Sequence, residues 1–385
     1  MVSRFSSQVT TSQVDFDVHG IVCLRLIDAL PQDVSAVTRQ IGPLQTSALD
    51  REPDIVIRYV DEIPIKDLCH VTYQGSGYTP DGFFILRSGR RATRVRIDFS
   101  QIGGRCKILC QRGLGPVPML IGIVTMTALS KGFVPLHGSA FVHDGTGVIV
   151  TGWSKGGKTE ALLSFSNHGA RYVGDEWILL SSDGRNVYGV PENIRLWEWH
   201  LQNLPHLLER VSREDRWLFR AIHSLEWLSS HALQRRFPWT ALHNAMPALK
   251  RQLNVVLPAQ VIFGEQTGPF SAEPRKLFFM VSHESQHIEV EPADPVAIAR
   301  RMSSSVRYEQ LVLMSAYLEF KFAFPEKRNE FLENAHELEH DLLCRALAGK
   351  EAYTVKHPYP VRFDELYRAM IPCLASSTVK SYSAY

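Results

Sequence analysis

An eight-residue segment, GWSKGGKT at positions 152–159, restricts the fold of this chain more than any other stretch of the sequence. It matches the pattern G-x-x-x-x-G-K-[ST], in which closely spaced glycines let a loop wrap phosphate oxygens with its backbone N–H groups. Lys158 brings positive charge to the β- and γ-phosphates, and Thr159 offers a hydroxyl to Mg²⁺. We therefore assign the following residues to nucleotide binding: Gly152, Trp153, Ser154, Lys155, Gly156, Gly157, Lys158 and Thr159.

The segments on either side of this loop have the order that a phosphate loop requires. Before it, GSAFVH (138–143) and GVIVTG (147–152) are predicted to form two strands joined by a hairpin turn at residues 144–145. After it, residues 158 to about 167 are predicted to form a helix whose positive dipole end faces the anion. Gly169 is predicted to close that helix in a left-handed conformation.

Two adjacent acids, Asp175 and Glu176, lie in RYVGDEWILL (171–180), which is predicted to be the strand after this helix. Phosphoryl transfer needs a carboxylate to hold Mg²⁺ and often a second one to accept the hydroxyl proton. Because side chains alternate along a strand, adjacent acids face opposite ways unless the strand ends or bulges, and Gly174 permits such a bend. His137, just before the predicted hairpin, is by its residue type alone a core or turn histidine.

The pieces LHGSAFVHDGTGVIVTG, GWSKGGKT and GARYVGDEW together resemble the HPr kinase/phosphorylase family of bacterial serine kinases. The resemblance covers residues 136 to about 200. It implies an α/β fold with a P-loop core of the HPr-kinase and phosphoenolpyruvate-carboxykinase type. It also implies that the loop binds ATP, that its lysine contacts the phosphates and that its threonine binds Mg²⁺.

The same resemblance implies roles for four residues outside the loop. His137 lies near the transferred phosphate, Asp175 is a metal-site carboxylate, and Glu176 is the proton acceptor. Glu198 matches, with a small gap, a family glutamate that helps to hold Mg²⁺. The alternative for Glu198 is a partly buried ion pair with Arg195 on a strand or helix.

The sequence departs from the family pattern at several positions. Lys155 stands where the family usually has a glycine, Trp153 where it often has an acid, and Glu176 replaces an aspartate. The family's downstream signature, Leu-Glu-Ile-Arg-Gly-Leu-Gly, is missing. The chain therefore looks more like divergent kinases of this group that act outside sugar regulation, including some linked to peptide natural-product pathways.

These features predict an ATP-dependent kinase that transfers the γ-phosphate to a hydroxyl acceptor, namely a serine of a peptide or protein such as a natural-product precursor peptide. Two alternatives use the same loop: a small-molecule kinase of the same fold, and a nucleotide-binding regulatory protein without transfer activity. The regulatory protein would need neither the two acids nor His137, so their presence favours catalysis. The resembled family forms oligomers, which makes a homo-oligomer a further expectation.

A remote alternative is a zinc metalloprotease, because residues 336–340 have the pattern H-E-x-x-H. On a helix His336 and His340 would share a face and bind Zn²⁺, with Glu337 as the base. Against this, Glu339 puts a charge between the ligands, and residues 326–347 are predicted to form an amphipathic helix with most of its acids solvated. The predicted apolar stripe of that helix is Phe331, Ala335, Leu338, Leu342 and Ala346.

Composition sets the class of protein. Hydrophobic residues make up 45% of the 385 residues and charged residues 21%, and the net charge of +2 gives no reason to expect nucleic-acid or membrane binding. Six scattered cysteines without a C-x-x-C pair, and a start without an apolar signal region, favour a reduced, cytoplasmic protein. Residues 117–129 are apolar but too short to span a bilayer comfortably, so they are predicted to be a core helix.

The pattern along the chain predicts two regions. Residues 1–112 are predicted to be a β-rich N-terminal region, and residues 113–385 the kinase core with a helical C-terminal half. Strands are also predicted at 261–264 and 276–283. A helical insertion at about 200–257 is predicted to be a core or lid, or a platform for the acceptor peptide. The tryptophans of this segment are Trp217, Trp227 and Trp239. Its arginines are predicted to form a solvated face or to meet an acidic substrate, and they are Arg216, Arg220, Arg235 and Arg236.

Overall fold

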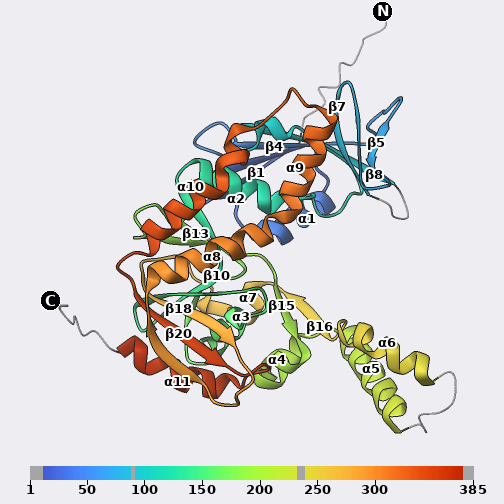
Figure 1. Ribbon diagram of the computed structural model, residues 1–385. Coiled ribbons are helices and arrows are strands. Elements are labelled where there is room, and N and C mark those ends of the chain that lie inside the picture. The colour runs from blue at the N-terminus through green and yellow to red at the C-terminus, as the bar shows by residue number, and fades with distance from the viewer. Residues whose placement is uncertain (1–11, 88–91, 232–238, 376–385) are drawn as a thin grey trace, which may run out of the picture.

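The computed structural model describes residues 12–87, 92–231 and 239–375. Within these ranges the chain is mixed α/β, with helices in both halves and two large sheets that lie one above the other in Figure 1. Arg235 and Arg236, which the sequence placed in a basic face, lie outside the described residues.

The first sheet contains nine strands in the described part of the chain, in the order β3-β1-β2-β4-β9-β8-β7-β6-β5. The pairs β2–β4 and β4–β9 are parallel and the others are antiparallel. Its strands are β1 (Gln13–Val18), β2 (Val22–Ile27), β3 (Gln45–Thr46), β4 (Ile55–Val60), β5 (Cys69–Thr72), β6 (Ser76–Thr79), β7 (Gly82–Arg87), β8 (Thr93–Ile97) and β9 (Cys106–Gln111). The β-rich character predicted before residue 112 is confirmed, with one long helix, α1 (Pro31–Ile41), among the strands.

The second sheet follows the order β17-β14-β13-β10-β11-β18-β20-β19, with β12 also paired to β10, and so has nine described strands. The strands β11, β18 and β20 are parallel to one another. Its strands are β10 (Phe133–His143), β11 (Thr146–Gly152), β12 (Arg171–Gly174), β13 (Trp177–Ser181), β14 (Val187–Gly189), β17 (Ser271–Ala272), β18 (Pro274–Ser282), β19 (Glu289–Ala293) and β20 (Glu351–His357).

The remaining elements are mostly helical. They are α2 (Leu120–Ser130), α3 (Lys158–Ser166), α4 (Glu198–Asn203), α5 (Arg213–His231), α6 (Trp239–Lys250), α7 (Ala259–Phe263), α8 (Pro295–Glu309), α9 (Leu311–Ala323), α10 (Glu330–Leu347) and α11 (Phe363–Ala375), with the short 3-10 turns η1 (Phe99–Gln101), η2 (Pro205–Arg210) and η3 (Gly264–Gln266). A separate two-stranded sheet joins β15 (Ile194–Trp197) to β16 (Asn254–Leu257).

Strand β11 shows how the second sheet is buried on both faces. Val148 and Val150 belong to the hydrophobic core shared with α3 and α11, whereas Ile149, between them, belongs to the core on the other face. Successive side chains of a strand point to opposite faces, so a continuous apolar run is what a doubly covered strand requires. The predicted hairpin is confirmed, because β10 and β11 pair antiparallel around a turn at residues 144–145.

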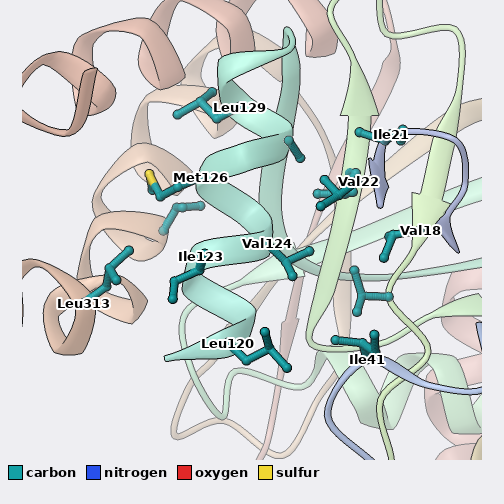
Figure 2. Close-up of a cluster of buried hydrophobic side chains, with 14 of the residues drawn as sticks. Val18, Ile21, Val22, Ile41, Leu120, Ile123, Val124, Met126, Leu129 and Leu313 are labelled. Atoms are coloured by element: carbon teal, nitrogen blue, oxygen red, sulfur yellow. The ribbon is translucent and has the colours of Figure 1, made fainter. Parts of the chain in front are cut away.

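Helix α2 links the two sheets, and it confirms the predicted core helix with a start at Leu120. Figure 2 shows its side chains between Val18 and Val22 of the first sheet and Leu313 of α9. Leu120, Ile123, Val124 and Leu129 are at most 1% exposed. One hydrophobic core therefore contains residues from both sheets and from the C-terminal helices.

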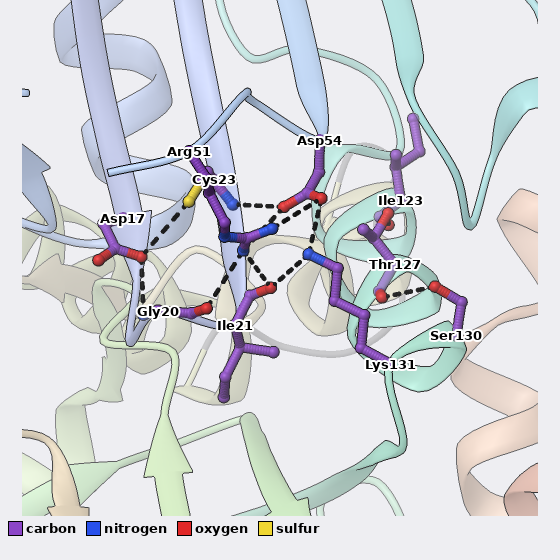
Figure 3. Close-up of polar contacts among 10 residues, drawn as sticks. All are labelled: Asp17, Gly20, Ile21, Cys23, Arg51, Asp54, Ile123, Thr127, Ser130 and Lys131. Carbon is purple, nitrogen blue, oxygen red and sulfur yellow. Dashed lines mark hydrogen bonds and ion pairs between the residues drawn. The ribbon is translucent and has the colours of Figure 1, made fainter. Parts of the chain in front are cut away.

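A polar cluster fixes the end of α2 to the first sheet (Figure 3). Asp54 accepts hydrogen bonds from the Cys23 amide at 2.8 Å, from Arg51 Nη1 at 3.1 Å and from Lys131 Nζ at 2.6 Å. Lys131 and Arg51 also donate to the Ile21 carbonyl. Asp54, Arg51 and Lys131 therefore each have a partner of opposite charge.

The segment predicted to be helical contains α4, α5 and α6 in its described part, and helices α5 and α6 project from the body as an arm (Figure 1). Its base is the β15–β16 pair, so the last residues of the predicted helical segment form a strand instead. Trp217 is 70% exposed and Trp227 60%, so neither is a core residue.

Several other predictions need correction. The expected strand at 261–264 is largely α7, where Pro258 precedes the first turn of a short helix. The strand expected at 171–180 is two strands, β12 and β13, and His137 lies inside β10 rather than before the hairpin. The strand predicted at 276–283 is confirmed as β18, but the C-terminal half is not purely helical, because β19 and β20, which were not predicted, also belong to the second sheet.

Helix α10 confirms the predicted amphipathic helix and buries Ala335, Leu342 and Ala346 as predicted, but the rest of its buried face differs. Leu338 is 38% exposed, whereas Glu339 is 2% exposed and accepts hydrogen bonds from Gln310. The buried stripe is Leu332, Ala335, Glu339, Leu342, Leu343, Ala346 and Leu347. Among the helices of the described ranges, none is both long enough and apolar enough to cross a bilayer. All six cysteines lie in these ranges and form no disulfide.

Candidate active site

The Gly152–Thr159 loop joins the end of β11 to the start of α3, as predicted. Gly157 has a φ of 104°, and a Cβ atom there would lie 2.3 Å from Nε2 of His357. A Cβ on Gly156 would lie 2.8 Å from the Trp153 carbonyl oxygen. Only glycine fits at these two positions, so the backbone N–H groups of the loop stay accessible beside the start of a helix.

His357 contacts the loop from its buried side. It is fully buried at the end of β20, with Nε2 2.9 Å from the Gly156 carbonyl oxygen and Nδ1 2.8 Å from that of Pro358. Nothing in the sequence near residue 357 signals this contact, because β20 follows the loop by about two hundred residues and pairs with it only through β18.

Lys158 is 5% exposed, and its Nζ donates to the Trp153 carbonyl oxygen at 3.0 Å. Burial lowers the pKa of its ammonium group, while the surrounding carboxylates, Glu176 first, act in the opposite direction. Among the described residues no carboxylate lies close enough to form an ion pair with this amine. The positive charge of Lys158 is therefore available to an anion in the loop.

Asp175 lies directly behind the loop. Thr159 Oγ1 donates to its Oδ2 at 3.0 Å, and Ser139 Oγ donates to its Oδ1. Burial, and then the neighbouring charge of Glu176, raise the pKa of this carboxyl group to about 6 despite these two hydrogen bonds. A buried carboxylate beside a threonine hydroxyl is an incomplete set of oxygen ligands for a hard divalent cation.

Glu176 turns the other way, into solvent-accessible space. Its φ of 63° is left-handed, and its side chain is 55% exposed. Its Oε2 lies 3.0 Å from Nε2 of His137, and this hydrogen bond is the main cause that lowers the pKa of Glu176. The expected break in the strand is confirmed, but the left-handed residue is Glu176. Gly174 has a different reason to be glycine, since a Cβ there would lie 2.6 Å from the Gly189 Cα.

A cavity of about 740 Å³ opens where these elements meet. It is lined by residues 154–159 of the loop, by His137 and Glu176, and by Arg195 from β15. Backbone N–H groups and cations on one side face a half-exposed carboxylate on another, so the cavity can hold an anion of several phosphates next to a general base.

Four predicted site residues lie outside the lining of this cavity. Asp175 is buried behind Thr159, as described above. Gly152 is buried at the end of β11. Trp153 is 50% exposed, and its ring centroid lies 5.2 Å from that of Tyr308. Both carboxylate oxygens of Glu198 lie 2.7 Å from His223 Nε2, so the structure does not bring Glu198 to Thr159 and Asp175, nor pair it with Arg195.

The structure adds two polar residues that the sequence analysis missed. Glu192 lines the cavity, its Oε1 is buried without a hydrogen-bond partner in the described structure, and burial together with Glu176 and Asp175 raises its pKa well above the usual range. Ser139 holds Asp175, and the two-residue period of the predicted strand could have placed it on the same face as His137.

His336, Glu337 and His340 of the H-E-x-x-H segment line a second cavity, of about 470 Å³, between α8 and α10. His340 Nδ1 is 3.0 Å from the Ser303 hydroxyl. Within the described ranges, no three or more His, Cys, Asp or Glu side chains gather in an arrangement that could hold a metal ion. His336 and His340 thus have no third protein ligand of these types there.

No family model matches this chain, and no curated protein matches it either. The functional argument therefore depends on the geometry of the site.

Proposed function

We propose that this protein is an ATP-dependent kinase that transfers the γ-phosphate to a serine hydroxyl of a peptide or protein. The observation that carries the proposal is the turn at Asp175 and Glu176. It presents one carboxylate to Thr159 behind the loop and the next to His137 in the cavity. Phosphoryl transfer needs these two positions, one carboxylate for the metal ion and one for the hydroxyl proton.

The order of the pieces supports a core of the HPr-kinase and phosphoenolpyruvate-carboxykinase type. In that proposal, the β10–β11 hairpin, the Gly152–Thr159 loop, α3 and the Asp175–Glu176 turn follow one another as in the family that the sequence resembles. The missing family signature after residue 200 and the projecting α5–α6 arm favour an acceptor other than HPr.

The residues of the cavity fit ATP and Mg²⁺. The loop N–H groups and Lys158 would hold the phosphates, and Thr159 and Asp175 would hold the metal ion, since Mg²⁺ prefers a few oxygen ligands from protein together with phosphate oxygens. Bound Mg²⁺ supplies charge neutralisation on the phosphates. Burial first, and then the charge of Glu176, raise the pKa of Asp175, and a bound cation would oppose both effects.

The chain's own residues then act mainly by position and charge. Glu176 is held as a carboxylate by His137 and accepts the proton of the attacking hydroxyl. Lys158 and His137 stabilise the negative charge that spreads over the phosphoryl oxygens during transfer. Trp177, whose ring centroid is 5.9 Å from that of His137, covers the ring on the cavity side.

The first test is a titration of the purified protein with ATP and Mg²⁺, beside Lys158→Ala and the control Lys107→Ala, which replaces an exposed lysine of β9. ADP release is followed with and without serine-containing candidate peptides. We expect ADP release only with an acceptor, and a loss of several orders of magnitude in Lys158→Ala but not in the control. An unimpaired Lys158→Ala protein would exclude this site.

A second variant separates transfer from binding. Glu176→Gln should still bind ATP but transfer phosphate poorly, because the amide cannot accept the hydroxyl proton. Full activity of Glu176→Gln would remove the base role. ATP binding without any transfer by the wild-type protein would favour the alternative of a regulatory nucleotide-binding protein.

A further inference from the structure

We propose that Glu309, the last residue of α8, is a positioning residue that keeps His137 doubly protonated and directed at Glu176. The contact itself is independent of the proposed function; only its kinetic consequence rests on the kinase proposal. Glu309 lies 172 positions after His137 in the sequence.

His137 lies between two carboxylates. Its Nε2 is 3.0 Å from Glu176 Oε2, and its Nδ1 is 3.3 Å from Glu309 Oε1. The ring is 2% exposed. Both Nδ1 and Glu309 Oε1 are buried and have no hydrogen-bond partner in the described structure, so the two atoms lie at an ion-pair distance without a formed hydrogen bond. Each of these two atoms is therefore the natural partner of the other, since buried polar atoms are almost always paired.

The residues on either side of Glu309 hold it in place. The Tyr308 ring lies against the ring of Trp153 in the loop. On the other side, the Gln310 amide donates to the buried Glu339 carboxyl of α10 at 3.1 Å. The end of α8 is therefore held at the loop on one side and at α10 on the other. Because its neighbours are held in this way, the Glu309 backbone is fixed in a position from which its side chain points at His137.

A carboxylate lies close to each nitrogen of the ring. The groups that face it are Glu176 from the β12–β13 turn and Glu309 from α8, with Lys158 of α3 and Asp175 close to them. The C-terminal end of α8 adds partial negative charge. A neutral imidazole donates through one nitrogen only, whereas a doubly protonated ring donates to both carboxylates.

This arrangement has a consequence for the proposed reaction. With Glu309 on Nδ1–H, the ring cannot rotate, and Nε2–H stays on Glu176 beside the position of the transferred phosphoryl group. Glu309 does not line the main cavity, so it acts through His137 and not on the substrate. We expect its removal to affect the transfer step more than ATP binding.

The test uses ¹⁵N-histidine NMR on the full-length protein at pH 7, with His137→Gln to assign the ring signals. The variants are Glu309→Gln, the conservative Glu309→Asp, and the control Glu326→Gln, an exposed acid after α9. We expect both His137 nitrogens to be protonated in the wild type and in the control. In Glu309→Gln, Nδ1 should lose its proton in most molecules, and Glu309→Asp should restore part of the signal.

The kinetic arm measures transfer in the same proteins. Glu309→Gln should lower kcat about a hundredfold with KM for ATP within about twofold. Unchanged His137 signals in a folded Glu309→Gln protein would overturn the inference, even if activity fell. A singly protonated wild-type ring would overturn it as well, without any variant. If the ring signals change as expected but the wild type transfers no phosphate, the role of Glu309 stands and the proposed function fails.

Discussion

Asp54 and Asp175 are both buried aspartates close to a lysine, one at the edge of β4 and one at the end of β12. Asp54 is paired with Lys131 at 2.6 Å and with Arg51 (Figure 3), and its contacts leave no charge without a partner. The Asp175 carboxyl group accepts hydrogen bonds from two hydroxyl groups, while Lys158 donates to a backbone carbonyl instead. Among the described residues, Asp54 has ion-pair partners and Asp175 has none.

The residues around Asp54 and those around Asp175 also differ. Near Asp54 the cations fix α2 to the first sheet, which is a purely structural task. Near Asp175, burial lowers the pKa of Lys158, raises that of Glu192, and the backbone of Glu176 is left-handed. Unfavourable burial and backbone strain persist where they serve a function. We therefore interpret the Asp54 cluster as part of the scaffold and the Asp175 cluster as part of the site.

The largest expected effect comes from Asp175→Asn. Transfer should fall about a thousandfold, because a neutral amide binds Mg²⁺ weakly. The free energy of unfolding at pH 7 should rise by about 1 kcal/mol, because the variant removes a buried charge whose pKa is raised. ADP release and urea unfolding measure the two effects, with Asp81→Asn as the exposed control. A destabilised Asp175→Asn protein would show that this charge is already balanced, as that of Asp54 is.

The opposite result is expected from Asp54→Ala. Removing it leaves Lys131 and the Cys23 amide without their partner, which should lower the free energy of unfolding by about 3 kcal/mol. ATP binding should change less than twofold in the folded protein. Urea unfolding and ATP titration measure both, and Asp50→Ala, an exposed acid nearby, should stay within about 0.5 kcal/mol. Loss of ATP affinity in folded Asp54→Ala would remove the distinction between the two clusters.

The parts of the fold that the sequence predicted are those coded by neighbouring residues. The β10–β11 hairpin, the loop and α3 follow one another without interruption, so periodicity and turn residues suffice. Strand β20 was missed because its only partners are β18 and β19, and pairing between distant segments leaves no local pattern. The buried face of α10 was misplaced because Glu339 breaks the apolar stripe at its centre.

The residues of the candidate site also fall into a group that the sequence predicted and a group that it did not. Lys158, Thr159, Glu176 and His137 lie within 40 residues of one another and line one cavity, with Asp175 behind Thr159. The polar residues that complete the site come from far along the chain or from unpatterned loops. Glu192 lines the cavity, whereas Glu309 and His357 lie behind its lining and contact His137 and the loop. A single polar residue in an otherwise ordinary segment carries no signal, since only the fold shows what it faces.

Glu339 is a third buried acid with which the comparison of Asp54 and Asp175 can be tested, and its hydrogen-bond partner, Gln310, is neutral. Its carboxyl receives hydrogen bonds from the Gln310 amide, and burial raises its pKa to about 8 from 4.5. Between these values the folded state binds more protons than the unfolded chain, so its stability should fall as pH rises, by about 1.4 kcal/mol per pH unit. From pH 6 to 7.5 the loss from this one group should be about 2 kcal/mol.

Glu339→Gln should remove this slope, because an amide does not titrate and can still pair with Gln310. The measurement is urea unfolding at several pH values between 6 and 7.5, and Glu337→Gln, an exposed acid on the same helix, should keep the wild-type slope. If Glu339→Gln and the wild type lose stability equally over this range, Glu339 is ionised in the folded protein and must have a cation nearby. Glu339 would then be balanced as Asp54 is, and Asp175, which has no ion-pair partner among the described residues, would stand as the exception that marks the site.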